Sequence, residues 1–83
     1  MSTGPGHRAE RVSLDFSWDR EAGAGYLALG PISAGEAVTQ RIVASPVQGM
    51  GEVVLDFAGD GRVLGIEFLG RRLLPPGLHD SAG

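Results

Sequence analysis

The chain has 83 residues, no cysteine and a formal net charge of −3 at pH 7, which predict a single small domain with a thin core. The lack of cysteine excludes disulfides, zinc–thiolate sites and thiol nucleophiles, and it favours a cytoplasmic location. The acidic balance argues against nucleic-acid binding, and the absence of an apolar run of about 18 residues argues against a membrane span.

The first half of the chain predicts a tail and three strands. Residues 1–11 are polar and glycine-containing, so we expect a disordered N-terminal tail. Apolar and polar residues alternate over 12–18, as is typical of a half-buried strand. Further strands are expected over 25–30, where Gly30-Pro31 ends the run, and over 36–45, where Gln40 interrupts the apolar side.

The second half predicts two more strands, 52–58 and 62–69, followed by a C-terminal tail over 74–83. No segment has a convincing period of 3.6 residues, although one short helical turn fits near the C-terminus. The predicted fold is therefore mainly β: one domain over 12–73, built as a small twisted antiparallel β-meander of about five strands.

The parity of the apolar residues predicts how the last two strands pair. Cross-strand partners share a face of the sheet, so the apolar sets of the two strands must face each other. A two-residue type I′ turn at Asp60-Gly61, or a four-residue turn over 58–61, meets this condition. The predicted pairs, which we expect to form the core, are Phe57 with Leu64, Leu55 with Ile66, and Val53 with Phe68.

The stretch DFAGDGRVLGIE, residues 56–67, also matches the calcium-loop pattern D-x-[DN]-x-[DN]-G-x5-E except at Ala58. Both flanks alternate with period two, whereas a calcium loop needs a helix on each side. The sequence therefore predicts a hairpin, no metal and no cofactor. A divalent-metal or small-ligand site remains the alternative, and its candidate residues are Asp19, Glu21, Asp56 and Glu67. The simpler interpretation is that Asp19 caps a turn and that Glu21 is solvated.

The segments WDREAGAGYLAL (18–29) and VVLDFAGDGRVLGIEFL (53–69) resemble a family of small bacterial proteins known as domain of unknown function 2283. The matching residues are Trp18, Asp19, Glu21, Ala24, Tyr26, Leu27, Asp56, Gly61, Leu64, Gly65, Ile66 and Glu67. Gly23, Gly25 and Ala58 depart from the family pattern, which weakens any ligand site built on its acids. The resemblance implies the same fold but no particular activity.

Catalytic residues are not predicted. His7 and His79 fall in the expected tails, and the chain has neither a G-x-S-x-G elbow nor a phosphate-binding loop with its lysine. A second apolar patch is expected on the outer face of the sheet, and its residues are Tyr26, Val54, Val63 and Leu69. We therefore expect a non-enzymatic cytoplasmic module that homodimerises, or binds a small protein partner, through this patch. No nucleic acid or membrane is expected as a partner.

Overall fold

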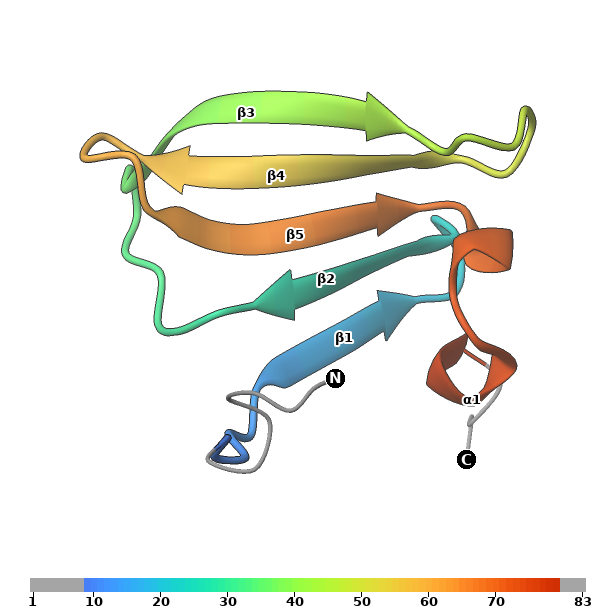
Figure 1. Ribbon diagram of the computed structural model, residues 1–83, viewed down its shortest axis with the longest axis horizontal. Helices are drawn as coiled ribbons and strands as arrows, with labels where there is room; N and C mark the ends of the chain where they lie inside the picture. The colour runs from blue at the N-terminus through green and yellow to red at the C-terminus, as the bar shows by residue number, and fades with distance from the viewer. Residues whose placement is uncertain (1–8, 80–83) are drawn as a thin grey trace.

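A computed structural model describes residues 9–79, which form one antiparallel sheet of five strands (Figure 1). The predicted mainly β fold is confirmed, and so is the short helical structure near the C-terminus. Residues 1–8 of the predicted N-terminal tail and residues 80–83 of the predicted C-terminal tail lie outside the described residues. In chain order the elements are β1 (Asp15–Asp19), β2 (Ala24–Ala28), β3 (Ala37–Ala44), β4 (Glu52–Ala58), β5 (Val63–Leu69), the 3₁₀ turn η2 (Arg71–Leu73) and α1 (Pro76–His79).

The strand order is β1-β2-β5-β4-β3. Three pairs of consecutive strands are neighbours, β1 with β2, β3 with β4 and β4 with β5, so the antiparallel meander is confirmed. The order itself could not be predicted, because β5 returns to lie between β2 and β4. As a result β1 and β3 are the two edges of the sheet, and residues 29–36 run from β2 to β3 along one end of it (Figure 1).

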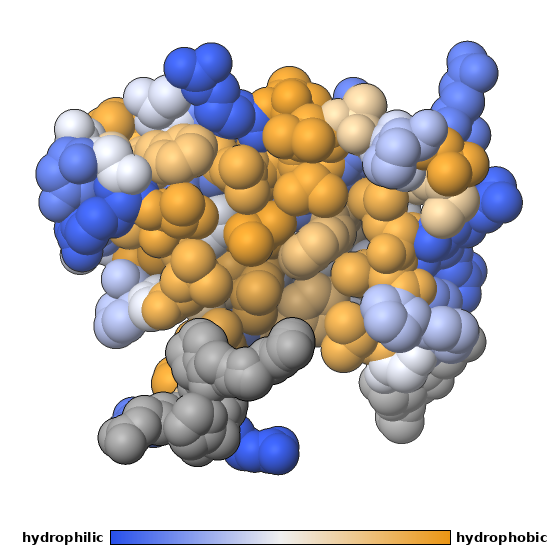
Figure 2. Space-filling view, in the orientation of Figure 1, coloured by the Kyte–Doolittle hydropathy of each residue, from blue (hydrophilic) through white to orange (hydrophobic). Residues whose placement is uncertain are grey.

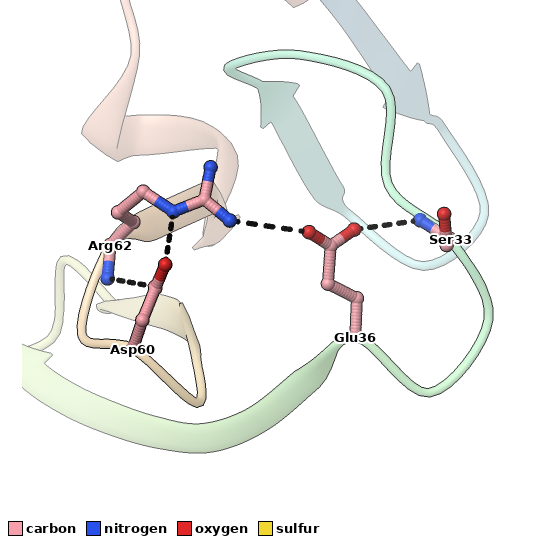
Figure 3. Close-up of polar contacts among 4 residues, drawn as sticks. All are labelled: Ser33, Glu36, Asp60 and Arg62. Atoms are coloured by element: carbon pink, nitrogen blue, oxygen red, sulfur yellow. Dashed lines mark hydrogen bonds and ion pairs between the residues drawn. The ribbon is translucent and has the colours of Figure 1, made fainter.

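A polar network ties this connection to the β4–β5 loop (Figure 3). The Nε of Arg62 lies 2.8 Å from Oδ2 of Asp60, and its Nη2 lies 3.6 Å from Oε2 of Glu36. Glu36 in turn accepts a 2.9 Å hydrogen bond from the backbone N–H of Ser33. Arg62 lowers the pKa of Asp60 through hydrogen bonds from its backbone and its side chain. Exposed pairs of this kind contribute little stability.

Asp19 forms the β1–β2 turn, as the simpler interpretation of this residue predicts. Its Oδ1 accepts hydrogen bonds from the backbone N–H groups of Glu21, at 3.1 Å, and Ala22, at 3.2 Å. Gly23 follows with φ 67°, a conformation that glycine adopts without steric cost. Its N–H donates to the carbonyl of Asp19, which closes the turn.

The β4–β5 loop differs from both predicted turns, because it contains three residues, 59–61. The N–H of Ala58 donates to the carbonyl of Arg62 at 2.8 Å, and the carbonyl of Ala58 accepts from the N–H of Gly61 at 2.9 Å. Gly61 has φ 93°, as is usual at the third position of such loops.

The register of β4 with β5 confirms two of the three predicted pairs, Leu55 with Ile66 and Val53 with Phe68. The third is wrong, because Phe57 pairs with Val63. A bulge next to Phe57 adds one residue to β5. Because of this extra residue, Leu55 and Val53 still face Ile66 and Phe68.

The register gives the sheet two chemically different faces. We call one the apolar face, because its apolar side chains include Phe16, Trp18, Leu27, Val53, Leu55, Phe57, Ile66 and Phe68. We call the other the carboxylate face, because it carries Asp15, Asp19, Glu52, Asp56 and Glu67. The prediction that Asp56 and Glu67 lie opposite the apolar residues is thus confirmed.

The expected core is not buried. Of the six apolar residues expected to form it, Leu64 alone is buried, and the other five are half-exposed. Val54 and Ala58, both on the carboxylate face, are the other buried apolar residues of the described chain. The physical reason is that, over residues 9–79, no second sheet lies on the apolar face, and the short helix α1, with four residues, contacts it at Trp18.

Candidate interaction surface

The apolar face forms a continuous hydrophobic surface. Figure 2 shows it as a hydrophobic surface that extends across the sheet. The rings of Phe16 and Phe68 meet edge to face with their centroids 6.2 Å apart. A Cβ built on Gly25 would lie 2.7 Å from Cζ of Phe16 and 3.1 Å from Cε3 of Trp18. The aromatic rings of β1 therefore lie against the backbone of β2, and glycine is required beneath them.

Charge separates the two faces of the sheet. Every carboxylate within the five strands lies on the carboxylate face. Arg41, which pairs with Leu55, is the single charged strand residue on the apolar face. The apolar face can therefore meet another apolar surface without removing a carboxylate from water, a step that is costly for an unpaired charge.

The structure does not gather the four predicted interface residues into one exposed apolar patch. Tyr26, Val54 and Leu69 share the carboxylate face, but Val54 is only 5% exposed. Val63, which is 38% exposed, pairs with Phe57 at the bulge and therefore does not share the face of Val54. The accessible apolar surface lies on the opposite face of the sheet, formed by residues that the sequence assigned to the core.

A buried carboxylate organises the carboxylate face. Asp56 is 9% exposed, and each of its oxygens accepts one hydrogen bond of 2.8 Å, from the hydroxyl of Tyr26 to Oδ2 and from Nε2 of Gln40 to Oδ1. Tyr26 comes from β2, which is not adjacent to β4, so its ring crosses β5 above Gly65. A Cβ built on Gly65 would lie 2.5 Å from Cζ of Tyr26, so a side chain at this position would displace the ring.

This environment raises the pKa of Tyr26 to about 12. Desolvation of the phenol is the main cause, followed by its hydrogen bond to Asp56 and by the negative charges of Asp56 and Glu67. Sequence reasoning missed the network, although one signal was present: Gln40 interrupts the apolar side of its strand because its amide serves Asp56.

The four carboxylates proposed for the alternative metal site are not assembled into one. Asp19 caps its turn, Glu21 is exposed beside it, and both oxygens of Asp56 already accept hydrogen bonds. Within residues 9–79 no group of three or more histidine, cysteine, aspartate or glutamate side chains is arranged to hold a metal ion. The ring of His79 lies 5.5 Å from the ring of Trp18, so this part of the expected tail packs against β1.

No helix in the described part of the chain is long and apolar enough to cross a membrane. No protein-family model, no curated protein and no solved structure matches the chain. The resemblance to domain of unknown function 2283 therefore stays a prediction.

Proposed function

We propose that the protein is a non-enzymatic interaction module in which two copies associate through their apolar faces. The observation that carries this proposal is the set of half-exposed side chains on the apolar face, above which the described chain places no second layer. Folded domains bury such a face against another layer of secondary structure. A second copy supplies that layer, and it converts a single sheet into a two-layered sandwich.

The size of the apolar face suits a dimer. Strands about 4.8 Å apart, with on average about six residues rising about 3.4 Å each, give a face of roughly 24 by 20 Å, or on the order of 500 Å². Protruding side chains raise the accessible area above this flat footprint, towards the roughly 800 Å² per partner of a standard interface. The acidic net charge is no obstacle, since the strand carboxylates of both copies point away from the contact.

Two features of the sequence support the rest of the proposal. The chain contains neither cysteine nor lysine, which agrees with a role that involves no covalent catalysis by these groups and with a reducing cytoplasm. The resemblance to a bacterial family without an assigned activity points the same way.

Light scattering of the purified full chain tests the face contact. Ile66 lies at the centre of the apolar face, between Leu27 on β2 and Leu55 on β4. Ile66→Lys places a charge where the two copies meet, and we expect it to halve the solution mass while the far-ultraviolet circular dichroism is retained. Val47→Lys is the matched control, because Val47 is 60% exposed and lies in the β3–β4 loop, outside the strands that form the face. An Ile66→Lys protein with the mass of the wild type, or a wild type of 8.6 kDa, overturns the proposal.

A further inference from the structure

Within residues 9–79, the outer edge of β3 pairs with no other strand. All eight residues of Ala37–Ala44 are exposed, and Val38, Ile42 and Val43 are among the most exposed large apolar residues of the described chain. Edge strands in proteins are usually short, charged or interrupted by proline, because their unpaired N–H and C=O groups otherwise attract another strand. The other edge of this sheet follows that rule: β1 has five residues and an aspartate at each end. β3 does not, since it is long, has no proline and carries Arg41 as its one charge.

The hydrogen bonding of β3 shows which backbone groups are available. The N–H of Ser45 donates to the carbonyl of Gly51 at 3.0 Å, so Ser45 directs its backbone groups towards β4. In an antiparallel pair this direction alternates from one residue to the next. Val43 and Arg41 therefore also bond β4, whereas Gln40, Ile42 and Ala44 direct their N–H and C=O groups towards the free edge.

We infer that β3 pairs antiparallel with β3 of a second copy, about a two-fold axis at Ile42 that is perpendicular to the sheet. A two-fold axis perpendicular to the sheet keeps every side chain on its own face, and cross-strand partners share a face. The axis must therefore pass between the two copies of one residue, which face each other. An axis at Arg41 would set the two guanidinium groups opposite each other, which is unfavourable. An axis at Gln40 would pair Ile42 with Val38 of the second copy, and at Val38 the register of β3 with β4 shifts. At Ile42 the contact uses the regular part of β3, and Arg41 faces Val43 of the second copy.

This arrangement is separate from the face contact and compatible with it. Pairing β3 with its copy joins two sheets edge to edge and leaves both apolar faces on the same side of the joint sheet. Two such sheets can then stack through their apolar faces, so the complete assembly contains four copies. Loss of one contact leaves a dimer held by the other.

Proline at position 42 tests the edge contact. The N–H of Ile42 does not bond β4, and the side chain is 66% exposed, so Ile42→Pro removes an outward donor without breaking the ladder inside the sheet. We expect Ile42→Pro to halve the solution mass while the circular dichroism is retained. Ile42→Thr keeps the N–H and the branched side chain, and it should keep the mass of the wild type. An Ile42→Pro protein that folds and retains the full mass overturns the inference.

A charge pair at the axis covers the case in which the proline variant fails to fold. Ile42→Lys sets two ammonium groups opposite each other and Ile42→Glu two carboxylates, so each variant alone should have half the mass of the wild type. Mixing them should restore the full mass, since lysine then faces glutamate across the axis. If mixing does not restore the full mass, the inference is overturned. The same result is expected if the strand of a different protein occupies this edge. If Ile66→Lys changes nothing while Ile42→Lys halves the mass, the edge contact stands and the face contact fails.

Discussion

At the scale of single residues, Asp56 shows how this thin sheet accommodates a buried charge. A buried carboxylate without partners would be strongly destabilising, but each oxygen of Asp56 accepts a hydrogen bond from a neutral donor. Tyr26 reaches it from β2 and Gln40 from β3, so one side chain on β4 links three strands. The network is possible only because Gly65 leaves room for the phenol ring over β5.

The titration of Tyr26 can be followed without overlap from other phenols, because Tyr26 is the only tyrosine in the chain. Its pKa is about 12 in the folded protein against a usual value of 10.0. The folded state therefore holds the phenolic proton more tightly than the unfolded state does. This contribution to stability is complete below pH 10, and it is lost as the pH rises from 10 to 12. Urea unfolding at several pH values in that range should show falling stability, with phenolate absorbance near 295 nm recorded in parallel.

Tyr26→Phe is the matched variant for this titration. It should lower the free energy of unfolding at pH 7 by about 1–3 kcal/mol, because Oδ2 of Asp56 loses its donor. The part of the pH dependence that belongs to the phenol should disappear with it. An ordinary phenol titration near pH 10 in the folded wild type would show that the hydroxyl is not held by Asp56.

The sequence predicted the face on which Asp56 lies but not its partners. Alternation from Val53 to Phe57 places Asp56 opposite the apolar side, and this depends only on the period of a strand. The contact with Tyr26 depends on strand order, because β5 must lie between β2 and β4 for the ring to pass over Gly65. Short-range pattern carries no information on that order.

At the scale of elements, the β4–β5 hairpin shows why the odd and even positions of the apolar residues predicted its register only in part. Parity fixes which residues share a face, and it cannot distinguish a regular turn from a three-residue loop followed by a bulge. Both arrangements bring Leu55 opposite Ile66, as observed. The bulge decides the position of Val63, which explains why the predicted outer patch was wrong at this residue.

Two glycine substitutions test the loop. In a three-residue loop of this kind, Gly59 occupies the second position of a type I turn, where proline is favoured. A Cβ at Gly59 would lie 3.8 Å from Cγ2 of Val38, which is ordinary contact. Gly59→Pro should therefore raise the free energy of unfolding by about 0.4–1 kcal/mol. Gly61→Ala should lower it by about 1–2 kcal/mol, since Gly61 has φ 93°. Urea denaturation measures both, and the opposite ranking would contradict the three-residue loop.

At the scale of the whole molecule, fold class and interaction surface follow from the same property of the chain. The sequence has enough strand pattern for one sheet, and between residues 9 and 79 it supplies nothing long enough to cover that sheet. The sequence could therefore predict a β fold with an uncovered apolar surface. It did not predict that Val54 is buried on the carboxylate face, where Tyr26 and Gln40 donate hydrogen bonds to Asp56.

If assembly completes the core, stability must depend on protein concentration. Mass action stabilises a folded state that associates, and for a dimer a tenfold rise in concentration adds about 1.4 kcal/mol per mole of dimer. For a chain of this length this corresponds to an increase of about 3–5 °C in Tm. Differential scanning calorimetry over two decades of concentration should show this rise in the wild type. The double variant Ile42→Lys/Ile66→Lys lacks both contacts, and it should unfold at a lower Tm that does not change with concentration. A wild-type Tm that is equally independent of concentration would mean that the sheet is stable as a single layer, and neither contact would then be needed to complete the fold.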